Sequence, residues 1–280
     1  MTDIHLLYPV KYFIIIQLIC CFLISPAYAQ NEQWDTYMAK FGDKPGSVLV
    51  DMALLPDAPD RKYPNLVITG PRAHHCNNQG LPDREEIEQL EEILDATNNF
   101  LTGVTPKILV GTFTYNCERL NYYYVKDTTG IRNALRRMYD RGFRDYNYVI
   151  RISSDPGWIT YRSFLYPNDE TLNWMENDKI ISKMLQHGDS LTTQRDITFD
   201  LSFRSDTDRR SFAALAISKG YKAEKYTDPK TPSDAYGLTV SKYAFVKMDF
   251  LTSTTSELKS ESRKHHGVYN GWTAPLKNGK

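Results

Sequence analysis

The sequence predicts an α+β protein built from two domains. The chain has 280 residues, of which 41% are hydrophobic and 24% charged, and this composition is typical of globular proteins. Short runs of β-branched and aromatic residues alternate with stretches that repeat apolar residues at helical spacing. A polar stretch, residues 188–194, separates an irregular first part from a regular second part. These three observations define the fold class.

The first 29 residues are predicted to be an export signal. Lys11 precedes an apolar stretch, residues 12–24, and small residues then lead to Ala29, after which cleavage is expected. The stretch is shorter than the roughly 20 apolar residues of a spanning helix. No later stretch is longer, so we expect no membrane span after signal removal. The mature chain is expected to be exported, either to the periplasm or as a secreted protein.

Loss of the signal leaves Cys76 and Cys117 as the cysteines of the mature chain. In an oxidising compartment two remaining cysteines pair most simply with each other. Such a bridge contributes about 4 kcal/mol in the chain-entropy treatment. Two alternatives stay open, namely a pair of inert thiols and a reactive Cys76 beside His74 and His75.

The first domain, residues 30–187, is predicted to contain a mixed sheet with helices. Its clearest helix begins after the N-cap Asp83, where Glu86 completes a capping box, and ends at Gly103. A shorter helix follows Gly130. The remaining elements are strands at residues 47–54, 66–69, 107–114, 119–126 and 145–152, and a last helix over about 170–186.

The second domain, residues 188–280, shows the order β-α-β-β-α-β. That order predicts a ferredoxin-like α+β sandwich. Gly220 and Gly267 stand where its two helices are expected to end. The predicted strands cover residues 197–203, 221–226, 236–248 and 271–276, and the helices cover 206–219 and 252–266.

Charge excludes one large class of partner. The chain carries 34 Lys and Arg against 34 Asp and Glu, so a nucleic-acid partner is not expected. The two parts of the chain differ in net charge, because residues 30–196 carry a net charge of −5 and residues 197–280 carry a net charge of +5.

The sequence contains none of the motifs that would indicate catalysis. A G-x-S-x-G elbow, a glycine-rich phosphate loop and an H-E-x-x-H pair are all absent from it. The histidines lack metal-ligand spacing, and His265 and His266 fit the end of a helix, where positive charge is favourable. We therefore expect no catalytic residue, no metal and no cofactor. Arginines between Arg132 and Arg144 are an alternative anion site.

The closing residues Gly267-Val-Tyr-Asn-Gly-Trp272 resemble the end motif of the regulator of ribonuclease E activity B family, Gly-x-Tyr-Asp-Gly-Trp. Asn270 replaces the aspartate, and Arg195 also fits the family. The preceding part, with Trp34 and the Gly80-Leu81-Pro82 turn, resembles a bacterial domain of unknown function, the family numbered 695. The residues expected to contact a partner are Arg195, Tyr269, Asn270, Gly271 and Trp272.

The resemblance implies a binding protein. The family's regulator is an acidic cytoplasmic protein that binds the scaffolding part of a ribonuclease and inhibits it without chemistry of its own. Here the matching domain is basic and follows an export signal. We therefore expect an exported, non-catalytic protein whose second domain binds another protein of the cell envelope or the exterior. The alternatives are a ribonuclease regulator if the chain is cytoplasmic, and an exported hydrolase or a sugar- or anion-binding module, with a groove lined by the tyrosines of residues 122–124.

Pairing of Cys76 with Cys117 leads to a direct prediction. Thiol labelling of the exported protein, denatured without reductant, is expected to modify no cysteine, because both thiols are consumed by the bridge. Reduction before labelling is expected to expose both. Two labelled thiols in the unreduced sample would show that the cysteines are free.

Overall fold

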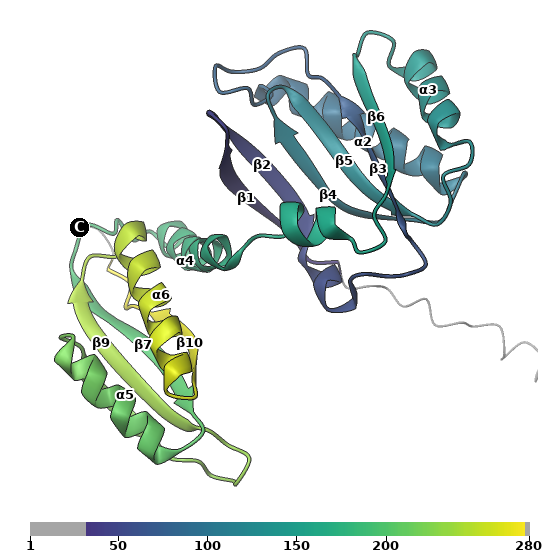
Figure 1. The fold of residues 1–280 in the computed structure, drawn as a ribbon. Helices are drawn as coiled ribbons and strands as arrows, with labels where there is room; N and C mark the ends of the chain where they lie inside the picture. The colour runs from purple at the N-terminus through teal and green to yellow at the C-terminus, as the bar shows by residue number, and fades with distance from the viewer. Residues whose placement is uncertain (1–31, 278–280) are drawn as a thin grey trace, which may run out of the picture.

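A computed structural model describes residues 32–277. Each half of the chain has a β-sheet of its own with helices packed on it (Figure 1). The two-domain α+β class predicted from the sequence is confirmed. The predicted export signal and its cleavage after Ala29 lie outside the described residues.

The first sheet has six strands in the order β1-β2-β4-β5-β3-β6, and every pair is antiparallel where the sequence predicted a mixed sheet. Both faces of the inner strand β5 are buried, because Tyr123 packs on one side and Tyr122 and Tyr124 on the other. The strands are β1 (Trp34–Phe41), β2 (Lys44–Asp51), β3 (Asn65–Pro71), β4 (Lys107–Tyr115), β5 (Glu118–Val125) and β6 (Tyr148–Ser154).

Helices cover both faces of this sheet. On one face, α2 (Arg84–Thr102) and α3 (Ile131–Gly142) enclose a core with Tyr123. On the other face, the 3-10 helix η1 (Met52–Asp57) and the π-helix η2 (Thr160–Leu165) pack over Tyr122 and Tyr124. These tyrosines are at most 5% exposed, so they form no open sugar-binding surface.

Strand β1 was not expected from the sequence. It lies at the edge of the sheet, and its side chains are mostly half-buried or exposed, so it lacks the strong apolar run of an inner strand. Its signal is the turn Gly42-Asp43, where Gly42 has a φ of 58° and Phe41 pairs with Lys44. Such two-residue turns favour glycine and aspartate and fix the register of a hairpin.

The second domain has the predicted ferredoxin-like arrangement. Its four antiparallel strands lie in the order β10-β7-β9-β8, which is the order 4-1-3-2 of a βαββαβ sandwich. Helices α5 (Asp206–Ser218) and α6 (Met248–Lys264) pack on one face of the sheet. The strands are β7 (Arg195–Phe203), β8 (Lys222–Thr227), β9 (Tyr236–Ala244) and β10 (Gly267–Thr273).

A bulge in β10 places two aromatic residues on one face. Tyr269 pairs with Leu201 and Trp272 with Phe199, and Asn270 is the extra residue between them. In a regular strand, residues three apart would face opposite sides of the sheet. The strand predicted at residues 271–276 begins earlier, at Gly267, and Gly271, with a φ of 131°, lies inside it at the bulge.

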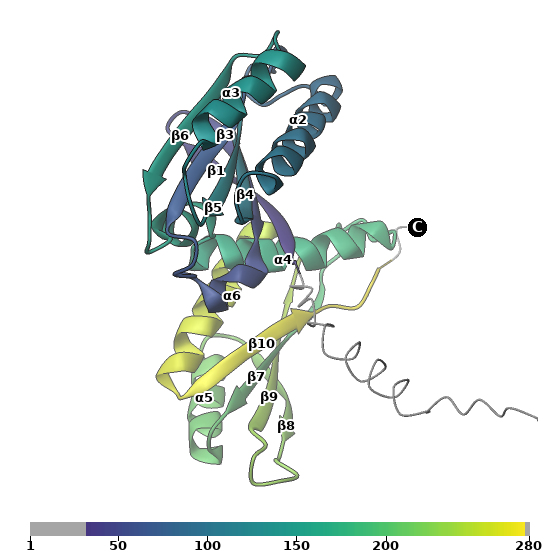
Figure 2. The same cartoon turned by 90° about the vertical axis from the view of Figure 1, so that its right-hand side faces the viewer.

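Helix α4 (Asp169–Gln186) packs against the second domain and lies between the two domains in both views (Figures 1 and 2). Ile181 and Met184 belong to the core of the second domain. Lys179 forms an ion pair with Asp35 of β1. The sequence placed the domain boundary after residue 187, at the end of this helix.

Arg195 is buried rather than presented to a partner. It is 2% exposed, and its guanidinium forms a bidentate ion pair with Asp189, in which Nη2 lies 3.0 Å from Oδ1. Arg195 also donates to the carbonyl of Pro275, and Asp189 accepts from the amide of Lys277. The hydrogen bonds from Arg195 hold the pKa of Asp189 well below its ordinary value. The pair thus ties the linker, β7 and the last described residues together.

Asp189→Asn is expected to destabilise the protein by about 3–5 kcal/mol, because it leaves the buried Arg195 guanidinium without its counter-charge. The stabilisation from the lowered pKa is fully present above the ordinary carboxyl pKa of about 3.9 and is lost as the pH falls below it. Urea unfolding at neutral pH measures the effect. Glu261→Gln, which removes an exposed pair with Lys264, serves as the control and is expected to cost less than about 1 kcal/mol. Equal losses in the two variants would contradict the role given to Asp189.

Candidate functional site

A groove of about 1160 Å³ lies in the second domain between α4, α6 and the start of β10. Figure 2 shows these elements side by side, with β10 at the outer edge of the sheet. The groove is lined by Asp169, Glu170, Leu172, Asn173, Trp174, Glu176, Asp249, Thr252, Ser253, Ser256, Lys259, Ser260, Arg263, Lys264, Gly267, Val268 and Tyr269.

Tyr269 is the central side chain of the groove. Its hydroxyl is buried and has no hydrogen-bond partner among the described residues. Burial, together with the negative charges of Glu176 and Asp200, raises the pKa of Tyr269 far above its ordinary value. The phenol therefore stays protonated at any physiological pH, and its hydroxyl keeps a proton to donate.

A second hydroxyl in the groove is also unpaired. Thr252 Oγ1 on α6 is buried without a hydrogen-bond partner among residues 32–277, while the Thr252 carbonyl accepts from Asn173 Nδ2 at 3.0 Å. Buried polar atoms in folded proteins are nearly always paired, so two orphans in one groove are unusual. Apolar surface lies beside them, because Trp174 is 40% exposed and Val268 60%.

Charges in the groove are separated by sign. Asp169, Glu170 and Asp249 lie in the first turns of α4 and α6, and Arg263 and Lys264 lie in the last turn of α6. Between the two ends, Lys259 Nζ bridges to Glu176 Oε2 at 2.6 Å and lies 5.8 Å from the centre of the Tyr269 ring. The groove is thus acidic at one end, basic at the other and neutralised in the middle.

The residues predicted to contact a partner are dispersed. Tyr269 lines the groove, whereas Trp272 is buried and donates from Nε1 to Asn177 Oδ1 at 2.8 Å. Asn270 is exposed, and its Oδ1 accepts from Ser202 at 3.4 Å. Gly271 allows the bulge, and Arg195 is buried beside Asp189. The sequence analysis did not identify Trp174 and Thr252 as site residues. Helical spacing places them on helices, but it does not indicate which elements those helices pack against.

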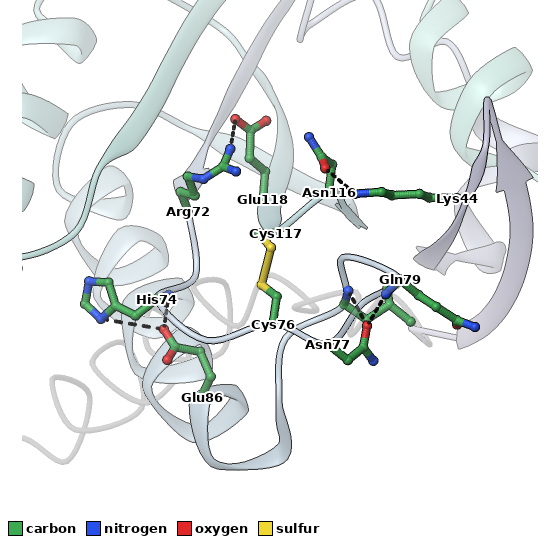
Figure 3. The surroundings of a disulfide bond; sticks show 11 residues. Lys44, Arg72, His74, Cys76, Asn77, Gln79, Glu86, Asn116, Cys117 and Glu118 are labelled. Carbon is green, nitrogen blue, oxygen red and sulfur yellow. Dashed lines mark hydrogen bonds and ion pairs between the residues drawn. A yellow bond between two sulfur atoms is a disulfide. The ribbon is translucent and has the colours of Figure 1, made fainter.

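Cys76 and Cys117 form a disulfide with their Cα atoms 6.0 Å apart (Figure 3). Cys117 lies in the tip of the β4–β5 hairpin, where it and Asn116 both have positive φ. The loop that carries Cys76 encloses this tip, because the Cys117 amide donates to Gly80 and its carbonyl accepts from Ala73. In this structure Cys76 has no free thiol.

His74 and two arginines of the predicted anion site, Arg132 and Arg144, are engaged in structural contacts. His74 stacks on Tyr146 at 4.1 Å, and its Nδ1 lies 4.0 Å from the buried Glu86 (Figure 3 shows the His74–Glu86 pair). Arg132 and Arg144 are held by the carbonyls of Ile150 and Asp140. Within the described part of the chain, no three His, Cys, Asp or Glu side chains gather as metal ligands. Within residues 32–277, no helix has both the length and the apolar character of a membrane span.

Two sequence families match the chain. Residues 32–166 match a family of unknown function, DUF695, and residues 174–273 match the family described as regulator of ribonuclease activity B. The two matches lie one after the other, in the order that the sequence resemblance implied. The second match begins inside α4, at the groove residue Trp174, and thus includes most of that helix.

No curated protein matches the sequence. A solved structure, described as an unknown protein from Galdieria sulphuraria, is 8% identical and covers 76% of this chain and 98% of its own. Its TM-score of 0.21 is too low to establish a common architecture.

The unpaired hydroxyl of Tyr269 predicts a contrast between two aromatic substitutions. Tyr269→Phe is expected to raise the free energy of unfolding by about 1–3 kcal/mol, because it removes an unpaired buried hydroxyl and no hydrogen bond is lost. Trp272→Phe is expected to lower it by about 2–4 kcal/mol, because Asn177 loses its donor and a cavity opens. Urea unfolding of both variants tests this, and a comparable loss for Tyr269→Phe would show that its hydroxyl is paired.

Proposed function

We propose that the chain is an exported, non-catalytic protein that binds another polypeptide in the groove of its second domain. The observation that carries the proposal is the pair of unpaired hydroxyls, Tyr269 Oη and Thr252 Oγ1, beside the exposed indole of Trp174. A buried hydroxyl without a partner costs about 1–3 kcal/mol. Acceptors on a bound polypeptide would remove that cost.

The shape of the groove favours a polypeptide over a small molecule. Its volume of about 1160 Å³ exceeds the roughly 300–1,000 Å³ of typical small-molecule pockets. Its lining includes Trp174, Tyr269 and Arg263, whose residue types are enriched at protein interfaces.

The groove lining supports binding without catalysis. Ser253, Ser256 and Ser260 offer hydroxyls, but a serine nucleophile needs an adjacent base to activate it. No histidine lines the groove in the described part of the chain, and His266 instead bonds Asp208 at 3.2 Å. The carboxylates at the acidic end lie in first helical turns, where negative charge is favourable without any catalytic role.

Export is supported by the apolar segment that ends near Ala29 and by the pairing of Cys76 with Cys117. Disulfides persist in oxidising compartments and are rare in the cytosol. A ribonuclease of the cytoplasm is therefore outside the reach of the mature chain. We propose that the second domain binds a protein partner in the envelope or the medium instead.

Site-specific crosslinking tests this function. A photoreactive residue in place of Trp174 is expected to capture a polypeptide in the exported fraction of the producing cells. The same residue in place of Tyr243, which is 61% exposed on β9 outside the groove, is the control and is expected to capture none. The capture at position 174 is expected to fall several-fold when Thr252→Val and Tyr269→Phe are combined, because both donors are then absent.

Equal capture at positions 174 and 243 would contradict a binding site in the groove. Recovery of the chain in the cytosol with its first 29 residues intact would instead contradict export, and control of an intracellular ribonuclease would then be the better interpretation.

A further inference from the structure

The separation of charge along the groove indicates how its occupant lies. We propose that the occupant of the groove is an extended segment that runs antiparallel to β10, an inference that rests on the proposed function. It is basic toward its N-terminal end and acidic toward its C-terminal end. The following observations support each part of this statement.

The acidic end attracts positive charge. Asp169, Glu170 and Asp249 have no ion-pair partner among the described residues, although all three line the groove. The helix dipole explains why acids stand in first turns, but it does not neutralise three carboxylates, since a helix N-terminus carries only about half a unit charge. A lysine, an arginine or a free amino terminus on the occupant would complete this end.

The basic end attracts negative charge. Arg263 has no ion-pair partner in the described part of the chain, and Lys264 pairs with the half-buried Glu261 at 2.9 Å. Glutamate, aspartate or a terminal carboxylate fits a guanidinium at this position. In the middle of the groove, the opposite charges of Lys259 and Glu176 cancel each other. The central residues of the occupant are therefore expected to be uncharged, with backbone carbonyls near Tyr269 and Thr252.

The edge of the sheet determines the direction. β10 pairs with β7 on one side and has no strand on the other among residues 32–277. Gly267, Val268 and Tyr269 line the groove, and an extended segment can pair with the backbone along such an edge. Every strand pair of this sheet is antiparallel, a mode slightly more stable than parallel pairing.

Strand polarity and charge give the same orientation. β10 begins at Gly267, directly after the basic last turn of α6, so its first residues lie at the basic end (Figure 2). A segment antiparallel to β10 therefore ends at Arg263 and Lys264. Its own acidic end then meets the basic end of the groove.

Two synthetic peptides of identical composition test this orientation on the mature chain. One carries two lysines, a Val-Phe-Val centre and two glutamates, and the other carries the same residues with lysines and glutamates exchanged. The first is expected to bind roughly tenfold more tightly in fluorescence anisotropy, from the sum of several exposed ion pairs. The preference is expected to vanish near 1 M salt, where the Debye length falls to about 3 Å.

Charge reversal tests whether the basic end of the groove determines the orientation of the bound peptide. The double variant Arg263→Glu and Lys264→Glu is expected to abolish the preference between the two peptides, because both ends of the groove are then acidic. Arg141→Glu, on the exposed face of α3 in the first domain, is the matched control and is expected to leave it unchanged.

Equal affinity for both peptides, or tighter binding of the exchanged one, would overturn the orientation. Failure of both peptides to bind would overturn the extended segment as the occupant. Because crosslinking at position 174 does not depend on orientation, capture there combined with either result would leave the proposed function standing and refute only this inference.

Discussion

The groove depends on a chain of buried hydrogen bonds that fixes α4 to the second domain. Asn177 donates to Thr255 Oγ1 at 3.1 Å and accepts from Trp272 at 2.8 Å, and Asn173 accepts from Thr255 at 2.9 Å. These contacts join α4, α6 and β10, the three elements that form the walls. Because both asparagines are only 2% exposed, an unpaired amide would be costly, and α4 has a single favourable position.

The same network explains why Tyr269 and Trp272 have different roles despite sharing a motif. The bulge at Asn270 turns both rings toward the helices. Trp272 donates to Asn177 and thereby stabilises the fold, whereas no acceptor among residues 32–277 reaches the hydroxyl of Tyr269. One motif therefore supplies both a support for α4 and a free donor in the groove. Tyr269 can carry a binding function because Trp272 carries the structural one.

Local patterns predicted most elements, and long-range contacts determined the rest. The residue pattern at Asp83 located the start of α2, although no capping box forms there, because Asp83 makes no side-chain cap hydrogen bond and Glu86 accepts from the His74 amide. The βαββαβ order located the second domain. β1 was not predicted from the sequence, because an edge strand can form with few apolar residues. Within the site, Tyr269 was found through its motif. Trp174 was not, because its exposure follows from where α4 docks, and Arg195 was misassigned because its partner Asp189 is identified only by the fold.

The disulfide also changes what proteolysis can do to the first domain. Cys76 and Cys117 are 41 positions apart, and the segment between them contains α2, β4 and the exposed residues Asn77, Asn78 and Gln79. A protease that nicks this exposed stretch leaves two fragments still joined through sulfur, and β3 still pairs with β5 across the break. Separation of the fragments then requires reduction as well as cleavage, so a nicked molecule keeps its two fragments joined.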